Sequence, residues 1–128
     1  MPPLIWWRAE PKPTKLPDAE HSLVEERKIR EYLLNPEHPQ GAAKARFFSA
    51  RGFGLADWPV FAAALSEQGR RNQVTLVTPT PWGTRYQVDC HCPTPDGLNP
   101  CIRTVWEVAG GGAPRLITSH PMNKLPSA

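Results

Sequence analysis

The chain has 128 residues and a mass of 14.3 kDa, a length that is typical of one domain and sufficient for a hydrophobic core without disulfide bridges. Hydrophobic residues make up 40% of the sequence, which excludes wholesale disorder, and no run of about 18 apolar residues predicts a membrane span. The net charge is +3 and most of the basic residues are arginines, whose guanidinium groups pair well with phosphate oxygens. Nucleic acid is therefore one candidate partner, and an ordinary basic surface is the alternative.

The N-terminal region is rich in proline, with five prolines in the first 17 residues, and cannot hold a helix or a central strand. We expect an extended arm over residues 1–17, one domain over residues 18–122 and a short tail over residues 123–128. The pair Trp6-Trp7 on this arm either packs on the domain or meets a partner. The N-terminus lacks the basic and apolar regions of a secretory signal, and three cysteines are an odd number, so we expect a cytoplasmic protein.

The three cysteines are Cys90, Cys92 and Cys101. The run Cys90-His91-Cys92 has the ligand types of a zinc site, but its spacing is tighter than usual and no second cluster follows. We interpret the cysteines as small residues buried in the domain, and we expect no metal and no cofactor.

Three helices are predicted in the first half of the domain. Ser22 and Glu25 match a capping box at the start of the first helix, and apolar residues follow at helical spacing. Gly52 is a typical end for the second helix, and Asp57 is a candidate cap for the third. The expected helices cover about residues 25–34, 42–50 and 56–69.

Beyond about residue 72 the apolar period changes from 3.6 to 2, which predicts β-strands. Short turns such as Pro95-Asp96-Gly97 separate these strands and favour an antiparallel meander. The expected strands cover about residues 74–78, 85–92, 101–108 and 115–120. Three helices followed by a four-stranded antiparallel sheet predict an α+β fold with the helices packed on one face of the sheet.

No Walker loop, dinucleotide-binding glycine motif, nucleophile elbow or zinc-protease helix occurs in the sequence. The remaining candidates begin with His38, in the loop before the second helix, and with Lys44 and Arg46 in the first turns of that helix. A helix N-terminus favours anions, and these two cations add full charges. The simpler alternatives are a histidine that caps the helix and a lysine on a solvated helix face.

A ribonuclease that works without metal needs a base, an acid and donors that stabilise charge on the phosphoryl oxygens. Histidine is suited to acid or base chemistry near neutrality, and lysine, arginine and threonine can supply the donors. The candidate catalytic residues are His38, Lys44, Arg103, Thr104 and Thr118. The alternative for Thr104 and Thr118 is that both are ordinary strand residues.

The run KIREYLLNPEHPQGAAKARFF and the later segments PWGTRYQV, IRTVWEV and PRLIT carry a family resemblance. Over about residues 15–121 the chain resembles a small bacterial domain family of unknown function with NPEHP, KARFF and RTVW signatures. The resemblance implies free-standing small proteins encoded beside a small partner in toxin–antitoxin-like pairs, with related domains at the C-terminal ends of polymorphic toxins. Helices followed by a four-stranded sheet are similar to the nuclease fold of barnase, EndoU, colicin ribonucleases and RelE-like toxins.

The motif matches imply further substrate-binding residues besides the catalytic candidates: Arg46, Arg85, Tyr86 and Arg115. His120 stands where the family often has an aromatic residue, and it is a chemically reasonable proton donor. The expected function is a metal-independent endoribonuclease toxin that leaves a 2′,3′-cyclic phosphate, with RNA and a small antitoxin-like protein as partners. The alternatives are a protein-binding or immunity module and an RNA-binding domain without turnover.

Overall fold

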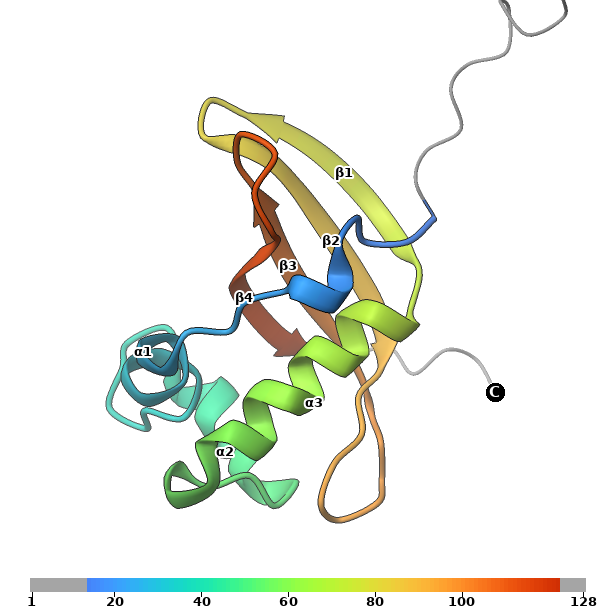
Figure 1. Cartoon of the computed structure of the whole chain (residues 1–128). Helices are drawn as coiled ribbons and strands as arrows, with labels where there is room; N and C mark the ends of the chain where they lie inside the picture. Colours follow the sequence, from blue (N-terminus) through green and yellow to red (C-terminus); the bar gives the residue numbers. More distant parts are fainter. Residues whose placement is uncertain (1–13, 123–128) are drawn as a thin grey trace, which may run out of the picture.

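The computed structural model of the chain describes residues 14–122 (Figure 1). The main elements are α1 (Glu26–Lys28), α2 (Ala42–Ala50), α3 (Trp58–Arg71), β1 (Val74–Thr80), β2 (Gly83–His91), β3 (Cys101–Val108) and β4 (Arg115–Pro121). The helices precede the sheet along the chain, which confirms the α+β fold with three helices and a four-stranded sheet. Among the described residues, no helix is both long and apolar enough to cross a membrane.

The sheet is an antiparallel meander with the strand order β1-β2-β3-β4, as predicted. The register between β3 and β4 shifts once: Val105 pairs with Thr118 and Trp106 pairs with Leu116, which leaves Ile117 as an extra residue. A bulge of this kind bends a strand and redirects its side chains. The edge strand β4 is therefore irregular at the position where it faces the first helix.

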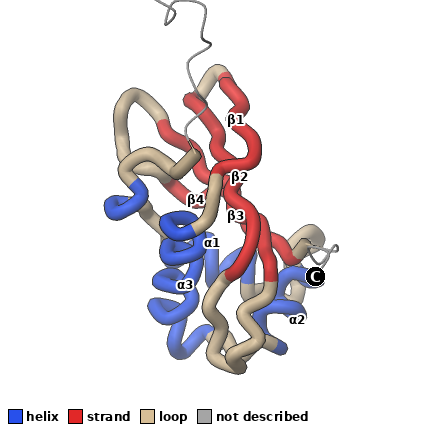
Figure 2. Tube along the Cα trace, turned by 90° about the vertical axis from the view of Figure 1, so that its right-hand side faces the viewer, coloured by secondary structure: helices blue, strands red, loops and turns tan. Residues whose placement is uncertain are grey.

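Helix α3 lies across β2 and β3, while α1 and α2 lie beside β4 (Figures 1 and 2). Phe61 and Leu65 on α3 and Ile102 and Trp106 on β3 are completely buried between these layers. Gly69 lets the helix approach closely, because a Cβ at this position would lie 2.8 Å from the Trp106 ring. The predicted apolar faces of α3 and the sheet thus form the core.

A buried polar network crosses this core. The Gln68 side-chain amide donates hydrogen bonds to the carbonyl oxygens of Val88, at 3.0 Å, and Ile102, at 3.1 Å. Thr104 Oγ1 donates to Gln68 Oε1 at 2.6 Å and accepts a hydrogen bond from Trp106 Nε1 at 2.7 Å. Because buried polar groups need partners, this chain of bonds fixes α3 on the sheet. Thr104, with 0% of its surface exposed, is committed to the core.

Helix α1 continues directly into η3 (Ile29–Leu33), a π-helical turn. The Leu34 N–H donates to the Ile29 carbonyl oxygen at 2.8 Å, which is the i to i+5 spacing of a π-turn. Together the two segments match the helix predicted over residues 25–34. The sequence period does not reveal the wider turn, which carries Tyr32.

Two residues predicted as helix caps make no capping side-chain bond, although Asp57 does occupy the N-cap position of α3. Ser22 does not cap α1, since its hydroxyl donates to Ser66 Oγ at 3.1 Å and no side chain caps this helix. Asp57 precedes α3 at the end of a 3-10 turn, η4 (Leu55–Asp57), without a capping side-chain bond. Gly52 does follow the end of α2, with φ of 104°, and its N–H donates to the Ser49 carbonyl oxygen.

The segment that leads into the domain packs on it. Residues 14–17, expected in the arm, are joined to the sheet by the Val74 N–H, which donates to the Thr14 carbonyl oxygen, and Leu16 is buried in the core. After a 3-10 turn, η2 (Ala19–His21), Leu23 forms a parallel bridge with Arg115 at the outer edge of β4. The rest of the predicted arm, with the Trp6-Trp7 pair, and the tail over residues 123–128 lie outside the described residues.

Candidate functional site

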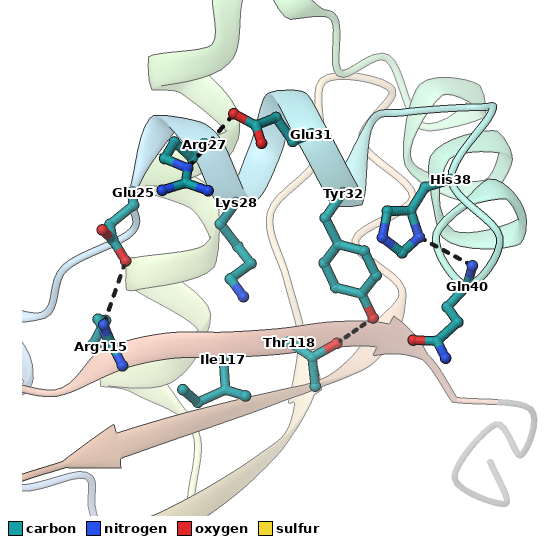
Figure 3. A pocket seen from close by; sticks show the side chains of 10 residues that line it. All are labelled: Glu25, Arg27, Lys28, Glu31, Tyr32, His38, Gln40, Arg115, Ile117 and Thr118. Atoms are coloured by element: carbon teal, nitrogen blue, oxygen red, sulfur yellow. Dashed lines mark hydrogen bonds and ion pairs between the residues drawn. The ribbon is translucent and has the colours of Figure 1, made fainter.

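A cavity of about 610 Å³ lies between the α1–η3 segment, the loop over residues 35–41 and the edge strand β4 (Figure 3). Its walls carry three residues that the sequence predicted for the site: His38, Arg115 and Thr118. The folded chain brings these together from two distant segments. The complete lining consists of Glu25, Arg27, Lys28, Glu31, Tyr32, His38, Gln40, Arg115, Ile117 and Thr118.

Tyr32 is the centre of the contacts at this cavity. Its phenol oxygen lies 3.1 Å from Thr118 Oγ1, and its ring meets the His38 ring edge-on with 4.9 Å between the centroids. The Nζ atoms of Lys44 and Lys28 lie 5.2 Å and 5.6 Å from the ring centroid. Four polar side chains from the helix, the loop, α2 and the sheet thus surround one phenol, and Figure 3 shows three of them, Lys28, His38 and Thr118.

The surroundings of Tyr32 favour its ionised form. Burial on its own raises the pKa of a phenol. Here the hydrogen bonds with Thr118 and Lys44, together with the positive charges of Lys44 and Lys28, outweigh burial, so that the pKa of Tyr32 is lowered. The phenol is therefore a stronger acid, and its phenolate more available, than in an unfolded chain.

His38 holds the loop that leads into α2. Its Nδ1 atom accepts the backbone N–H groups of Gln40 and Gly41, each at 3.0 Å. This is the capping role named as the alternative for His38. Since Nδ1 is an acceptor, the neutral ring carries its hydrogen on Nε2, and this N–H is the group that remains for a ligand.

The cavity also gathers positive charge. Lys28 and Lys44 form no ion pair within residues 14–122, and Lys44 Nζ donates instead to the Gln40 carbonyl oxygen at 3.1 Å. Arg115, which also lines the cavity, is paired with Glu107 at 3.7 Å and with Glu25 at 3.9 Å. Ammonium groups without a carboxylate partner at a concave surface favour an anionic ligand.

Three predicted residues lie together elsewhere, on the sheet face away from the helices. Arg103 forms two hydrogen bonds with Asp89, at 2.9 Å and 3.1 Å, and Arg85 pairs with Glu107 at 3.2 Å. His120 is the cross-strand neighbour of Arg103. Because alternate residues of a strand face opposite sides, this group is separate from the buried Thr104. None of the three lines the cavity.

The remaining predicted residues are also outside the cavity. Arg46 is exposed on α2, and Tyr86 packs against the hydrophobic core from β2. Thr104 is completely buried in the network with Gln68, so it has no surface to offer a substrate. The predicted set therefore divides into a cavity group, an open-face group, core residues and two cations on α2, of which Lys44 lies beside the Tyr32 ring and Arg46 is exposed.

Lys28 and Tyr32 are two cavity residues that the sequence analysis did not single out. In the sequence, Tyr32 fits the apolar period of the first predicted helix. Its spacing of four from Lys28 was the available signal, because residues at i and i+4 share one helix face and place the ammonium group beside the aromatic ring.

The comparison with protein families gives a match over residues 15–123 to a domain of unknown function, DUF6883. The chain belongs to this family. The match confirms the resemblance to a domain family of unknown function, and by itself it assigns no activity. No curated protein matches the chain.

One solved structure with a similar fold is a contact-dependent growth inhibition toxin–immunity protein complex from Klebsiella pneumoniae 342. One of its chains superimposes with a TM-score of 0.65, covering 84% of this chain and 98% of that chain at 19% sequence identity. At this identity the likeness shows a shared fold, and the activity has to be argued from the site.

Proposed function

We propose that the protein is a metal-independent endoribonuclease that cleaves RNA through a 2′,3′-cyclic phosphate and acts as the toxin of a toxin–antitoxin-like pair. The observation that carries this proposal is the cavity in which Tyr32, His38 and Thr118 meet the cations Lys28 and Arg115. The shared fold with one chain of a toxin–immunity complex supports the biological setting.

The cavity holds the chemical groups that such a reaction needs. Cleavage requires cations or N–H donors at the phosphoryl oxygens, and groups that move a proton from the 2′-hydroxyl and to the leaving 5′-oxygen. Lys28 and the guanidinium of Arg115 are placed to hold the phosphate, and the Nε2–H of His38 adds a neutral donor. Tyr32, on the same helical segment as Lys28, and Thr118, on the same strand as Arg115, supply hydroxyl groups (Figure 3).

This assignment changes the role expected of His38. A general base at Nε2 would need the hydrogen on Nδ1, where it would face the N–H groups of Gln40 and Gly41. We therefore assign His38 to donate a hydrogen bond and to position the loop. Lys44, in the first turn of α2, adds a positive charge beside the Tyr32 ring.

The donor set of the cavity favours a mechanism without metal. Its two carboxylates do not form a pair that could share an ion, because Glu25 is held by Arg115 and Glu31 lies 3.5 Å from Arg27. Divalent cations such as Mg²⁺ require several oxygen ligands around one point. A grouping of three candidate ligands on the described chain, Asp18, Glu20 and His21, is exposed and does not line the cavity.

The test is cleavage of bulk RNA by the purified chain, with and without chelator. We expect products that end in a 2′,3′-cyclic phosphate and a 5′-hydroxyl, at a rate that EDTA leaves unchanged. Lys28→Met and His38→Ala should lower the rate, whereas Arg70→Ala, an exposed change on α3, should not. A rate that falls in EDTA and returns with Mg²⁺ would contradict the metal-independent mechanism.

The shared fold also supports a second candidate, a binding or immunity module without catalysis. The structural neighbour is one chain of a complex between two proteins. In this role the same cations, Lys28, Lys44 and Arg115, would engage acidic side chains of a small partner protein. A wild-type chain that binds a partner encoded beside it but leaves RNA intact would favour this function.

An RNA-binding domain without turnover would bind RNA with a strong salt dependence and release no products.

A further inference from the structure

Tyr32 is a partly buried titratable group of the cavity, and no sequence motif pointed to it as a proton carrier. Its oxygen contacts Thr118 Oγ1 at 3.1 Å, and ammonium groups approach its ring from two elements, Lys28 on its own helix and Lys44 on α2. The Thr118 hydroxyl lies within hydrogen-bond distance of the phenol oxygen, and the two ammonium groups place positive charge beside the ring. A hydrogen-bond partner and nearby positive charges both stabilise a phenol oxygen as an anion.

The local backbone presents Tyr32 to the cavity. It lies in the π-turn η3. Turns of this kind are rare in proteins, and those that occur are often found at functional sites. Gly41 packs against the Tyr32 carbonyl oxygen and ring, where a Cβ would collide. The helix and the His38 loop are thereby held together, and the phenol is directed at β4 (Figure 3).

We propose that Tyr32 is the general base of the reaction and removes the proton from the 2′-hydroxyl of the RNA. This inference rests on the ribonuclease function proposed above and deepens it. Of the proton-handling groups at the cavity, His38 has its Nδ1 engaged by the loop, and the carboxylates are paired with arginines. The Tyr32 phenol lines the cavity and is paired with the neutral hydroxyl of Thr118.

The steps balance without a cofactor. The Tyr32 phenolate takes the 2′-hydroxyl proton, and the 2′-oxygen forms a bond to phosphorus. The bond from phosphorus to the 5′-oxygen breaks, its electron pair stays on the 5′-oxygen, and this oxygen takes a proton from the Lys28 ammonium. The Tyr32 phenol then returns its proton to Lys28 through water, which restores both groups for the next turnover.

Ionisation of Tyr32 can be measured without any activity. The chain has 2 tyrosines, Tyr32 and Tyr86, and phenolate formation changes the near-ultraviolet absorbance. We expect one tyrosine of the folded chain to ionise at lower pH than the other. Tyr32→Phe should remove the early step, and Tyr86→Phe should keep it. Lys44→Met should shift it to higher pH, whereas Lys15→Met, remote from the cavity, should not.

The activity test compares single-turnover cleavage of RNA across pH. The wild-type rate should rise with pH along the ionisation curve of Tyr32, because the phenolate is the active form. Tyr32→Phe keeps the ring but removes the base, so its rate should fall by about 10²–10⁴-fold and lose the rising limb. In Lys44→Met, the rising part of the pH–rate profile should move to higher pH, together with the absorbance change that reports ionisation of Tyr32. The titratable and charged groups that face this site, and whose variants complete the pH comparison, are Glu25, Arg27, Lys28, Glu31, His38, Lys44 and Arg115.

Several outcomes would overturn the inference. One is a Tyr32→Phe rate equal to that of wild type. Another is a Tyr32→Phe rate that is lower by the same factor at every pH and still rises with pH, which is the behaviour of a purely structural residue. Simultaneous ionisation of both tyrosines would also overturn it. A wild-type chain that cleaves no RNA at any pH overturns the proposed function itself, and that result is seen before any variant is compared.

Discussion

The phenol oxygen of Tyr32 lies 3.1 Å from Thr118 Oγ1, and this hydrogen bond joins the first helix to the last strand across 86 positions of sequence. The partner strand is irregular here, since Ile117 is the extra residue of the bulge just before Thr118. The bond therefore spans the cavity wall, and it links the group that we assign as base to the rigid sheet.

The first prediction concerns this bond. Thr118→Val keeps the shape of the side chain and removes the hydroxyl, which costs the site a hydrogen bond worth about 1 kcal/mol. We expect RNA cleavage to slow by about fivefold, the rate equivalent of that energy. Thr118→Ser, which keeps the hydroxyl, is the matched control. Equal rates for wild type and Thr118→Val, at unchanged thermal stability, would show that the bond does not support the reaction.

The second prediction concerns the glycine behind the site. A Cβ at Gly41 would collide with the Tyr32 carbonyl oxygen and lie 3.2 Å from the His38 Cβ. Gly41→Ala should therefore lower the free energy of unfolding by about 1–3 kcal/mol, as overpacking does, and displace the His38 loop. Urea unfolding measures the loss. Gly54→Ala is the control, because no atom lies within 4 Å of the position its Cβ would take. Equal losses in the two variants would contradict the close packing at Gly41.

The third prediction separates a core threonine from a catalytic one. Thr104→Val leaves Trp106 Nε1–H without its acceptor and Gln68 without its donor. Unsatisfied buried groups cost about 1–3 kcal/mol each, so the free energy of unfolding should fall by at least this amount. Thr104→Ser keeps the hydroxyl, so it should retain most of the stability that Thr104→Val loses. Cleavage per folded molecule should be unchanged at low temperature, and a selective loss of activity at full stability would instead return Thr104 to the site.

Elements were predictable from the sequence because their signals are local. The change of period near residue 72 reflects side chains that alternate between a core face and an open face within each strand, and β3 extends from Cys101 to Val108 as predicted. The same alternation excludes a catalytic site that contains both Arg103 and Thr104. Arg103 and Thr104 are neighbours on a strand, so they face opposite sides and cannot both reach one substrate.

The candidate site was less predictable because it depends on long-range geometry. The motif around His38 pointed to the correct loop, and Thr118 was on the correct strand. What joins them is Tyr32, whose direction depends on the π-turn in η3 and whose partner depends on the bulge at Ile117. Neither irregularity has a residue pattern as specific as a glycine turn, and each is decided by packing between distant segments.

The fourth prediction concerns the cysteines. Burial raises the pKa of Cys92 to about 12, and burial together with the neighbouring Cys90 raises that of Cys101 to about 12. Since the thiolate is the reactive form, iodoacetamide near neutral pH should label Cys90, which is partly exposed, well before the other two. Peptide mass spectrometry of the native and the urea-unfolded chain measures the order. Labelling of native Cys92 as fast as Cys90 would contradict its burial in the core.

The fifth prediction follows from the same shift and concerns stability at high pH. The pKa of Cys92 is raised from 9.0 to about 12 on folding, so its neutral thiol favours the folded state fully below pH 9.0 and progressively less as pH rises toward 12. The free energy of unfolding should therefore fall from about pH 9.0 up to about pH 12, the interval in which the thiol is ionised in the unfolded chain and still protonated in the folded one. Tyr32 acts in the opposite sense, because its lowered pKa favours the folded state as pH rises. Urea midpoints of wild type and Cys92→Ala separate the two, since the variant should lose less stability over this range than wild type. An equal loss in both chains would mean that ionisation of Cys92 does not limit the alkaline stability of the fold.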